Sequence, residues 1–436
     1  MAEPSRLPAR AEGGLLVAGG VRFPWSGSPP RIYSSRMDAS STLAAALDRA
    51  VDLDRLLDTA HRLIAVPSRT GDAGAVLDQL ADILRADGFA VARPAAGHPA
   101  APAIVVRLDS GRPGPTLQFD GHLDTVHLPF IAPGRDADRL TGSGSCDMKA
   151  GTAAAVEALR VLRDTGALTA GSVLFTAHDL HEAPWGFGQQ LDQMIRDGLH
   201  GDAVLIPESL SSYIPVVGRG AATWEVHIRR SGVPIHEVHR PADEPSVIAA
   251  GADLVGLLAD LQERLSTRID PHAGCETVFI GQIHSGEIYN QYPQECRLEG
   301  TRRWLPGVQR HDVEKEFRLL LDGLAAGSHT SVRCDFRFIR DAFRLDPIDR
   351  LVRAFQTSYE SLAGKTLPLG AKPFVDDANS FYGLGPIPAI THGPNAGGAH
   401  TLGEWVDIAD LRRVAHVYAL TAALYCANRS PHEVVA

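Results

Sequence analysis

Hydrophobic and polar positions follow two distinct patterns between residues 50 and 209. Segments with the apolar period of a helix are separated by short apolar runs that are typical of buried strands. We expect helices at 50–66, 73–87, 151–164 and 191–199, and strands at 89–95, 103–108, 115–120, 172–179 and 202–209. This order predicts an α/β fold with a mostly parallel sheet and helices on both of its faces.

The pattern changes near residue 218. Strands that are exposed on one face are expected at 222–230, 277–286, 296–305 and 331–339, with helices at 244–266 and 311–325. This β-α-β-β-α-β order is that of a ferredoxin-like α+β domain. The earlier pattern resumes near residue 345, so we expect residues 218–343 to be inserted into a larger domain made of 37–217 and 344–436.

Composition narrows the class of protein. The 436 residues include 42 basic and 52 acidic side chains, and the net charge of −10 argues against a nucleic-acid partner. No apolar run is long enough to cross a membrane, and the first residues lack the apolar segment of a secretory signal. The five cysteines are scattered without a CxxC motif, which favours a reducing cytoplasm over a disulfide framework. Residues 1–36, rich in Pro, Gly, Ser and Arg, are expected to form a loosely ordered N-terminal extension.

Candidate chemistry gathers between residues 121 and 151. His122 and Asp147 offer a nitrogen and an oxygen ligand that suit zinc, and Asp124 could hold the His122 imidazole in one tautomer from behind. These residues follow predicted strands, and α/β sheets carry their chemistry where strands end. The alternative is that His122 is an ordinary satisfied histidine and that the Gly-rich stretch is a plain loop. Cys146, beside Asp147, is interpreted as a small packing residue.

Several ordered blocks of this sequence resemble one known family. The blocks are GHLDTV at 121–126, GSGSCDMKAG at 142–151, DAVLIPE at 202–208, GP at 393–394 and HTLGEWV at 400–406. They are similar to the motifs of the dinuclear zinc amidohydrolases that include acetylornithine deacetylase, succinyl-diaminopimelate desuccinylase, aminoacylase and carboxypeptidase G. The resemblance covers about residues 45–430. It implies a catalytic, metal-binding larger domain and an inserted domain that acts as a lid and forms a homodimer.

The resemblance also implies the metal ligands. Asp147 would bridge two divalent ions, His122 and Glu208 would complete one of them, and Glu182 and His400 would complete the other. Zn²⁺ is favoured, with Co²⁺ and Mn²⁺ as alternatives, because carboxylate and imidazole ligands suit zinc. A cis peptide bond after Asp147 is expected as well.

Four further residues resemble one catalytic and three substrate-binding positions of the family, and the implied substrate is a small molecule with a carboxylate. They are His236, Asn290, Arg303 and Gly393. His236 would reach the partner subunit's active site and stabilise an oxyanion there. Asn290 and Arg303 would bind the substrate carboxylate, for which the planar guanidinium fork of arginine is suited. Two neighbours, His239 and Arg302, compete for the roles of His236 and Arg303.

One position departs from the family pattern. The family has two consecutive glutamates, a general base followed by a zinc ligand, whereas this chain has His181 before Glu182. An imidazole can serve as a general base near neutral pH, and two nearby zinc ions would favour its neutral form. The alternative is that His181 only packs or forms a structural hydrogen bond.

Three functions follow in order of preference. The first is hydrolysis of the amide bond of an N-acyl amino acid or small peptide by zinc-activated water, with His181 as the base. The second is acyl transfer or amide-bond formation on the same scaffold, because loss of the carboxylate base would disfavour water as the nucleophile. The third is a non-catalytic small-molecule binding protein, against which the retention of all five ligand positions argues.

Overall fold

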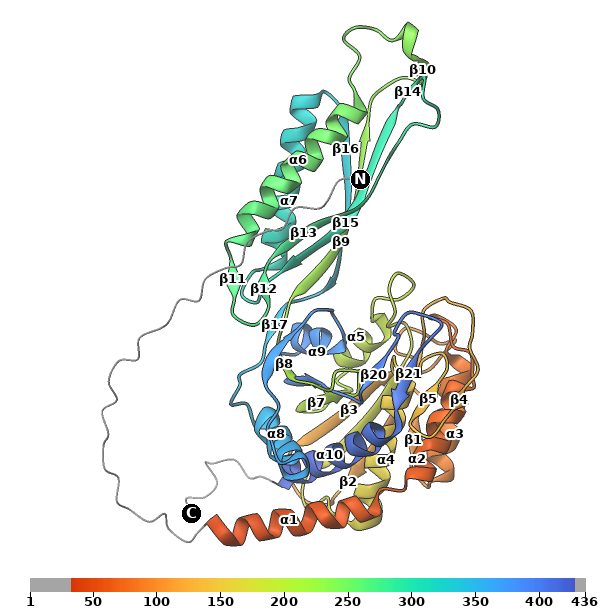
Figure 1. The fold of residues 1–436 in the computed structure, drawn as a ribbon, viewed down its shortest axis with the longest axis vertical. Helices are drawn as coiled ribbons and strands as arrows, with labels where there is room; N and C mark the ends of the chain where they lie inside the picture. The colour runs from red at the N-terminus through yellow and green to blue at the C-terminus, as the bar shows by residue number, and fades with distance from the viewer. Residues whose placement is uncertain (1–32, 428–436) are drawn as a thin grey trace, which may run out of the picture. The chain divides into compact units, whose positions relative to one another are not determined.

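A computed structural model of the chain describes residues 33–427, with side chains from Thr42 onward (Figure 1). The expectation for residues 1–36 therefore lies almost wholly outside the described residues; only the start of helix α1 (Tyr33–Ala50) overlaps it. None of the helices between residues 33 and 427 combines the length and hydropathy that a membrane crossing requires. All five cysteines are free thiols, as their scattered positions predict.

The larger part of the fold is built around a six-stranded sheet. Its strands, in spatial order, are β1 (Val91–Ala92), β2 (Ile104–Asp109), β6 (Ser172–His178), β3 (Thr116–His122), β7 (Ala203–Ile206) and β19 (Ala389–Thr391). The pairs β6–β3, β3–β7 and β7–β19 are parallel, while β1–β2 and β2–β6 are antiparallel. The expectation of a mostly parallel sheet is confirmed.

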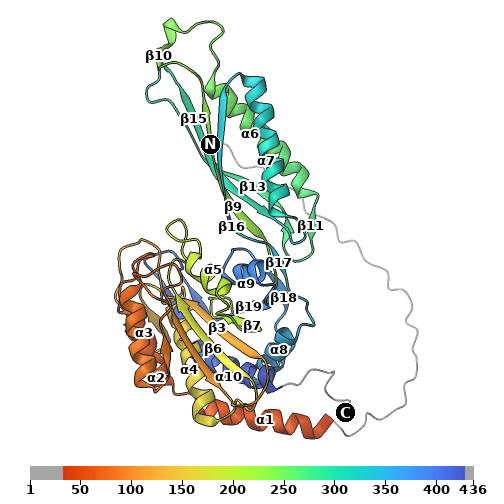
Figure 2. The same ribbon diagram turned by 180° about the vertical axis from the view of Figure 1, so that it is seen from behind.

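Helices cover both faces of this sheet because its strands are apolar on both sides (Figure 2). In β7, Ala203 and Leu205 join the main core, whereas Val204 and Ile206 face a second, smaller core. The main core includes α2 (Leu53–Ile64), α3 (Gly74–Ala86), α4 (Lys149–Thr165), α8 (Arg350–Ala363) and α10 (Ile408–Ala427). The second core includes α5 (Gln189–Arg196) and α9 (Asp377–Leu384).

The inserted segment forms a separate four-stranded antiparallel sheet. Its spatial order is β13 (Thr277–Ser285), β15 (Glu295–Trp304), β9 (Gly220–Arg229) and β16 (Ser331–Arg340). Its core is completed by α6 (Val247–Ser266) and α7 (Arg310–Ser328). This strand order confirms the ferredoxin-like prediction. The exact domain boundaries stay predictions, since the chain from Ser41 onward forms one compact unit.

Short strands make up the remaining sheets. One contains β17 (Phe343–Arg344), β8 (Ile214–Gly218) and β18 (Leu369–Lys372); another contains β20 (Ala396–Gly397), β21 (Trp405–Asp407), β5 (Arg139–Thr141) and β4 (Gly134–Arg135). Two two-stranded ladders pair β10 (Ile235–His236) with β14 (Gln291–Tyr292) and β11 (Ile269–Asp270) with β12 (Gly274–Cys275).

One aromatic ring lies at the centre of the core of the inserted segment, and its removal should destabilise this domain. Phe317 on α7 is 1% exposed, and its ring centroid lies 5.4 Å from those of Trp224 and Phe336. Phe317→Ala should lower the free energy of unfolding of this domain by about 3–5 kcal/mol, because it removes a buried ring and leaves a cavity. Urea denaturation followed by tryptophan fluorescence measures the change. Leu319→Ala on the same helix, where the side chain is 61% exposed, should cost less than about 0.5 kcal/mol, and equal losses in the two variants would contradict this account.

Candidate metal centre

The candidate ligands meet where parallel strands end. His122 is the last residue of β3, Glu208 follows β7 by two residues, and the segment that carries His181 and Glu182 follows β6. Because β3, β6 and β7 are parallel neighbours, their carboxyl ends bring these side chains to one edge of the sheet. Asp147 enters from the loop before α4.

Asp147 lies between two pairs of side chains. Its Oδ1 is 3.1 Å from Nε2 of His122, which is in turn 3.3 Å from Oε1 of Glu208. Its Oδ2 is 3.3 Å from Nε2 of His400, which is 3.2 Å from Oε2 of Glu182. The structure thus brings all five sequence-predicted ligands together, and the two oxygens of Asp147 face different pairs.

The donor set fits two divalent cations. Ligands bonded to tetrahedral zinc at about 2.0–2.1 Å are about 3.3 Å apart, which is close to the four spacings given above. Burial and the charge of Asp147 raise the pKa of Glu208 to about 7, and the same two causes raise the pKa of Glu182. Hydrogen bonds to Asp147 and Glu182 raise the pKa of His400 to about 10. This crowding of carboxylates is relieved by positive charge, which divalent ions would supply.

Asp124 contacts both halves of the centre from behind. The Nδ1 atom of His122 lies 3.1 Å from the backbone carbonyl of Asp124 and 3.5 Å from its carboxylate, so Nε2 faces Asp147. The other carboxylate oxygen of Asp124 accepts hydrogen bonds from the backbone N–H groups of His181 and Glu182, each at 3.0 Å. Burial alone would raise the pKa of Asp124, but the His122 imidazole outweighs burial and lowers it to about 2.

Glycines allow the loop around Asp147 to come close to its neighbours. Gly142 and Gly144 have φ values of +124° and +82°, a left-handed conformation that favours glycine. A Cβ on Gly151, in the first turn of α4, would lie 2.0 Å from the carbonyl oxygen of Pro207, the residue before Glu208. The peptide bond after Asp147 is cis, as the resemblance implies.

Glu404 holds this loop from the other side. One of its carboxylate oxygens accepts hydrogen bonds from the backbone N–H groups of Gly144, Cys146 and Asp147 at 3.1, 3.1 and 3.3 Å. The sequence shows Glu404 only as part of the block at 400–406, and its role was not predicted. Cys146 is buried with its Sγ 3.3 Å from the Ser209 hydroxyl, in keeping with its interpretation as a packing residue.

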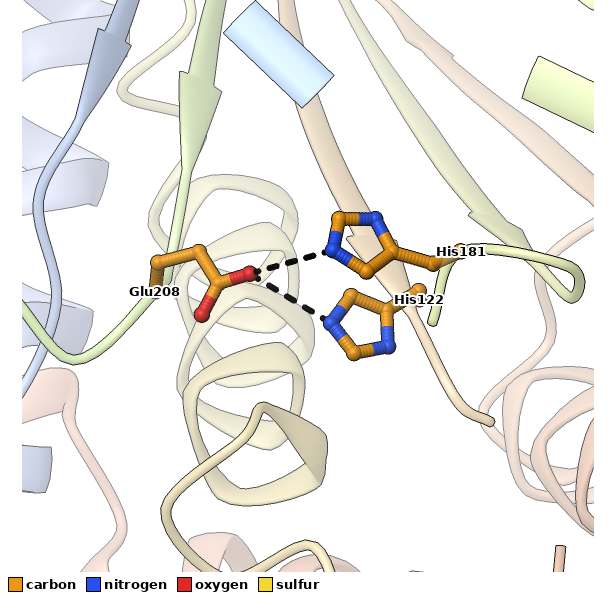
Figure 3. Close-up of side chains that lie close together, drawn as sticks. All are labelled: His122, His181 and Glu208. Atoms are coloured by element: carbon orange, nitrogen blue, oxygen red, sulfur yellow. Dashed lines mark ion pairs between the residues drawn. The ribbon is translucent and has the colours of Figure 1, made fainter. Parts of the chain in front are cut away.

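His181 stands beside the first ligand pair (Figure 3). Its ring stacks on that of His122, with centroids 3.9 Å apart and planes 5° from parallel, and its Nε2 lies 3.9 Å from Oε1 of Glu208. An imidazole lone pair lies in the ring plane, so one ion cannot lie in the planes of both stacked rings. The placement therefore favours a role for His181 beside the ions over a role as a ligand.

The other nitrogen of His181 has a partner that the sequence did not reveal. Nδ1 lies 2.9 Å from Oδ1 of Asp377, the first residue of α9. Burial alone would lower the pKa of His181, but the Asp377 carboxylate and other acidic neighbours raise it above its usual value. The side chain is 11% exposed, so its ring is largely shielded from solvent.

The residues predicted to contact the substrate do not all lie beside the five ligand side chains. His236 and Asn290 lie together in the inserted domain, with Nε2 and Nδ2 3.1 Å apart, and neither bonds to the five ligand side chains within the described range. Arg302 is buried in an ion pair with Glu276 at 2.6 Å, which makes it structural.

Arg303 and Gly393 are the remaining two positions. Arg303 has a buried Nη1 without a hydrogen-bond partner among the described residues. Gly393 lies against the backbone of Glu208, because a Cβ there would lie 2.3 Å from the carbonyl oxygen of that residue.

Comparisons with known proteins agree with this geometry. The profile of peptidase family M20/M25/M40 matches residues 119–424. A succinyl-diaminopimelate desuccinylase of Methylobacterium radiotolerans is 28% identical over 395 residues, which are 85% of this chain and 97% of that protein.

Two solved structures share the fold. Aminopeptidase PepT from Bacillus cereus has a TM-score of 0.73 at 20% identity, covering 86% of this chain and 99% of that one. The Bacillus subtilis YXEP protein, described as a dinuclear metal-binding peptidase, has a TM-score of 0.65 at 16% identity, covering 86% and 98%.

The contacts of Glu404 predict a loss of metal affinity. Glu404→Ala should weaken zinc binding roughly 10–100-fold, because three backbone donors beside Asp147 lose their acceptor and the loop is no longer held. Competition with a chromophoric zinc chelator measures the change. Glu360→Ala, an exposed position on α8, is the matched control and should bind zinc as the unmodified protein does. Unchanged affinity in Glu404→Ala would show that the loop holds its shape without this carboxylate.

Proposed function

Because the chain belongs to peptidase family M20/M25/M40, we propose that it cleaves the amide bond of an N-acyl amino acid or a small peptide. Its family and its relatives make it a zinc-dependent hydrolase of the metallopeptidase type. The observation that carries the finer proposal is the position of Asp147, whose two carboxylate oxygens face two separate ligand pairs. In this proposal His122 and Glu208 hold one ion, and Glu182 and His400 hold the other.

Two ions bound there would polarise the amide carbonyl and acidify a water molecule. Asp147 would hold both ions through its two oxygens, and Asp124 would keep Nε2 of His122 directed at its ion. The His122 side chain is fully buried, which strengthens its charge interactions, whereas the His400 side chain is 55% exposed. Zn²⁺ is the proposed metal, with Co²⁺ and Mn²⁺ as alternatives.

His181 is proposed as the general base. Its Nδ1 is occupied by Asp377, so Nε2 is the nitrogen left to accept a proton from the attacking water and to return it to the leaving amine. Nε2 lies on the side of Glu208, where the first ion would be bound. An imidazole thus takes the place that a glutamate occupies in the family pattern.

The proposed substrate carries a carboxylate. The buried, unpartnered Nη1 of Arg303 supports this, and a desuccinylase among the relatives acts on a succinylated amino acid, as its name states. Asn290 and Gly393 are proposed to assist in binding. His236 is exposed in the inserted domain, which supports its proposed role across a homodimer in the partner subunit's active site. A cytoplasmic location is proposed because all five cysteines are free.

The proposal predicts metal-dependent release of free amine. Protein dialysed against a chelator should release none from a panel of N-acetyl and N-succinyl amino acids and dipeptides, because neither water activation nor carbonyl polarisation is then available. Two equivalents of Zn²⁺ should restore release, whereas Mg²⁺ should not, since the ligand set includes two imidazoles. A ninhydrin-type amine assay follows the reaction. Release that persists in the chelated protein would contradict the proposal.

A second prediction concerns the base. His181→Ala should lower turnover by roughly 10²–10⁴-fold while two zinc ions stay bound, because it removes a proton acceptor and no ligand. His200→Ala, whose ring contacts only the backbone oxygen of Gly201 among the hydrogen bonds of the described residues, is the control and should retain activity. Steady-state rates and atomic-absorption measurements of zinc test both variants.

The outcomes separate the alternatives. Loss of one zinc ion in His181→Ala would make His181 a ligand instead of a base. His181→Glu restores the family pair and should keep or raise hydrolysis. Should His181→Glu create hydrolysis in a protein that otherwise has none, the natural reaction would be acyl transfer or amide-bond formation.

A further inference from the structure

Four buried side chains form a line of alternating carboxylates and imidazoles that ends at the proposed base. Asp120 on β3, His178 at the end of β6 and Asp377 at the start of α9 lie behind His181. The Nε2 atom of His178 is 3.4 Å from Oδ2 of Asp120 and 3.3 Å from Oδ2 of Asp377. The other oxygen of Asp377 is 2.9 Å from Nδ1 of His181. Asp377 therefore joins the two imidazoles.

The charge state of this line follows from its contacts. Nδ1 of His178 faces the backbone oxygen of Asp179 at 3.3 Å, and Nε2 faces two carboxylates, so both ring nitrogens have only acceptors as neighbours. An imidazole in that position carries a proton on each nitrogen. His178 thus offsets one of the two buried negative charges, and the Thr176 hydroxyl, which donates to Asp120, further fixes the far end.

This arrangement leaves one carboxylate oxygen of Asp377 for His181. Among the described residues, the Arg340 guanidinium also lies near that oxygen, with its Nη2 3.8 Å away. Arg340 donates through Nη1 to the backbone oxygens of Phe187 and Ile339, and its Nη2 is farther from this oxygen than Nδ1 of His181, so His181 is the closer partner. Since a carboxylate can only accept, Nδ1 of His181 must be the protonated nitrogen.

The neighbouring Asp376 shows that helix α9 does not need the carboxylate of Asp377. Asp376 is the N-cap: its Oδ1 accepts from the backbone N–H of Ala378 at 2.9 Å, and its Oδ2 accepts from the Thr391 hydroxyl at 2.6 Å. It also pairs with the buried Lys372. The structural duties at this helix start belong to Asp376, while the carboxylate of Asp377 points at two imidazoles.

We infer that Asp377 is a positioning residue for the reaction: it accepts the Nδ1 proton of His181, fixes the tautomer with its lone pair on Nε2, and holds that nitrogen toward Glu208. His178 lies behind Asp377 at an ion-pair distance of 3.3 Å, and Asp120 lies 3.4 Å from the same imidazole nitrogen; neither contact is a hydrogen bond. The inference rests on the proposed role of His181 as the base. A carboxylate behind a general-base histidine keeps the imidazole in the productive tautomer and orientation. Replacing the carboxylate with an amide favours the other tautomer, in which the proton is on the other ring nitrogen.

The test uses the full-length, zinc-loaded protein labelled with ¹⁵N in its histidines. The His181 signals are assigned by their disappearance in His181→Ala, and their chemical shifts report which ring nitrogen carries the proton. The unmodified protein should show Nδ1–H, and Asp377→Asn should shift the population toward Nε2–H. Finding Nε2–H in the unmodified protein overturns the inference whether or not Asp377→Asn folds.

Kinetics on the N-acyl amino acid panel supply the second readout. Asp377→Asn should lower kcat by roughly 10²–10⁴-fold with KM and zinc content unchanged, and it should add no further loss in the His181→Ala background, because the two residues act as one unit.

Asp376→Asn is the matched control: it should lower the thermal midpoint and leave the His181 tautomer unchanged. Equal tautomers and equal kcat in Asp377→Asn and the unmodified protein would sink the inference while leaving amide hydrolysis intact. If no amine is released by any variant, the proposed function fails and the tautomer measurement still decides the role of Asp377.

Discussion

The burial of three carboxylates beside one another is the constraint on which the rest of the centre depends. The ends of parallel strands and the loop before α4 bring Asp147 close enough to Glu182 and Glu208 for its charge to act on both. Like charges so close in a buried place cannot all stay ionised without compensating positive charge, and the raised pKa values of Glu182 and Glu208 express that cost. The imidazoles of His122 and His400 compensate part of this negative charge, and a pair of divalent ions would compensate the rest.

Much of the fold was predictable because it depends on local periodicity. The apolar runs at 103–108 and 172–179 became β2 and β6, and the helices of the inserted domain ended within a few residues of their predicted positions. The run at 89–95 shortened to the two residues of β1, since Pro94 cannot donate to a ladder. The small sheet of β8, β17 and β18 was not predicted, because its strands are two to five residues long and carry too little alternation to be detected.

The candidate site was predictable only where neighbouring residues form a motif. His122, Asp147 and His400 stand in blocks that can be read directly, and the structure places them together with Glu182 and Glu208. Asp377 lies 196 residues from His181, in a stretch without any such block, so its contact depends on how α9 packs behind the sheet. Glu404 lies 257 residues from Asp147 and contacts backbone N–H groups. Nearly every residue has such a group, so the sequence does not indicate which ones a carboxylate will bind.

The centre differs from the family pattern at His181, where an imidazole stands in place of a glutamate. A glutamate base needs no particular tautomer, whereas a histidine base must present the correct nitrogen, and the inferred role of Asp377 meets that requirement. Replacing the base therefore changes the demands on residues that do not touch the substrate. In the proposed function, the base and its supporting carboxylate form one unit, and the five ligand positions form another.

Anomalous diffraction at the zinc edge from crystals of the zinc-loaded protein is the most direct test of this account. Two peaks should appear, one among His122, Asp147 and Glu208 and the other among Asp147, Glu182 and His400, with the His181 ring outside bonding distance of both. A single peak, or a peak bonded to Nε2 of His181, would contradict the central claim that Asp147 bridges two ions while His181 stays free to accept a proton.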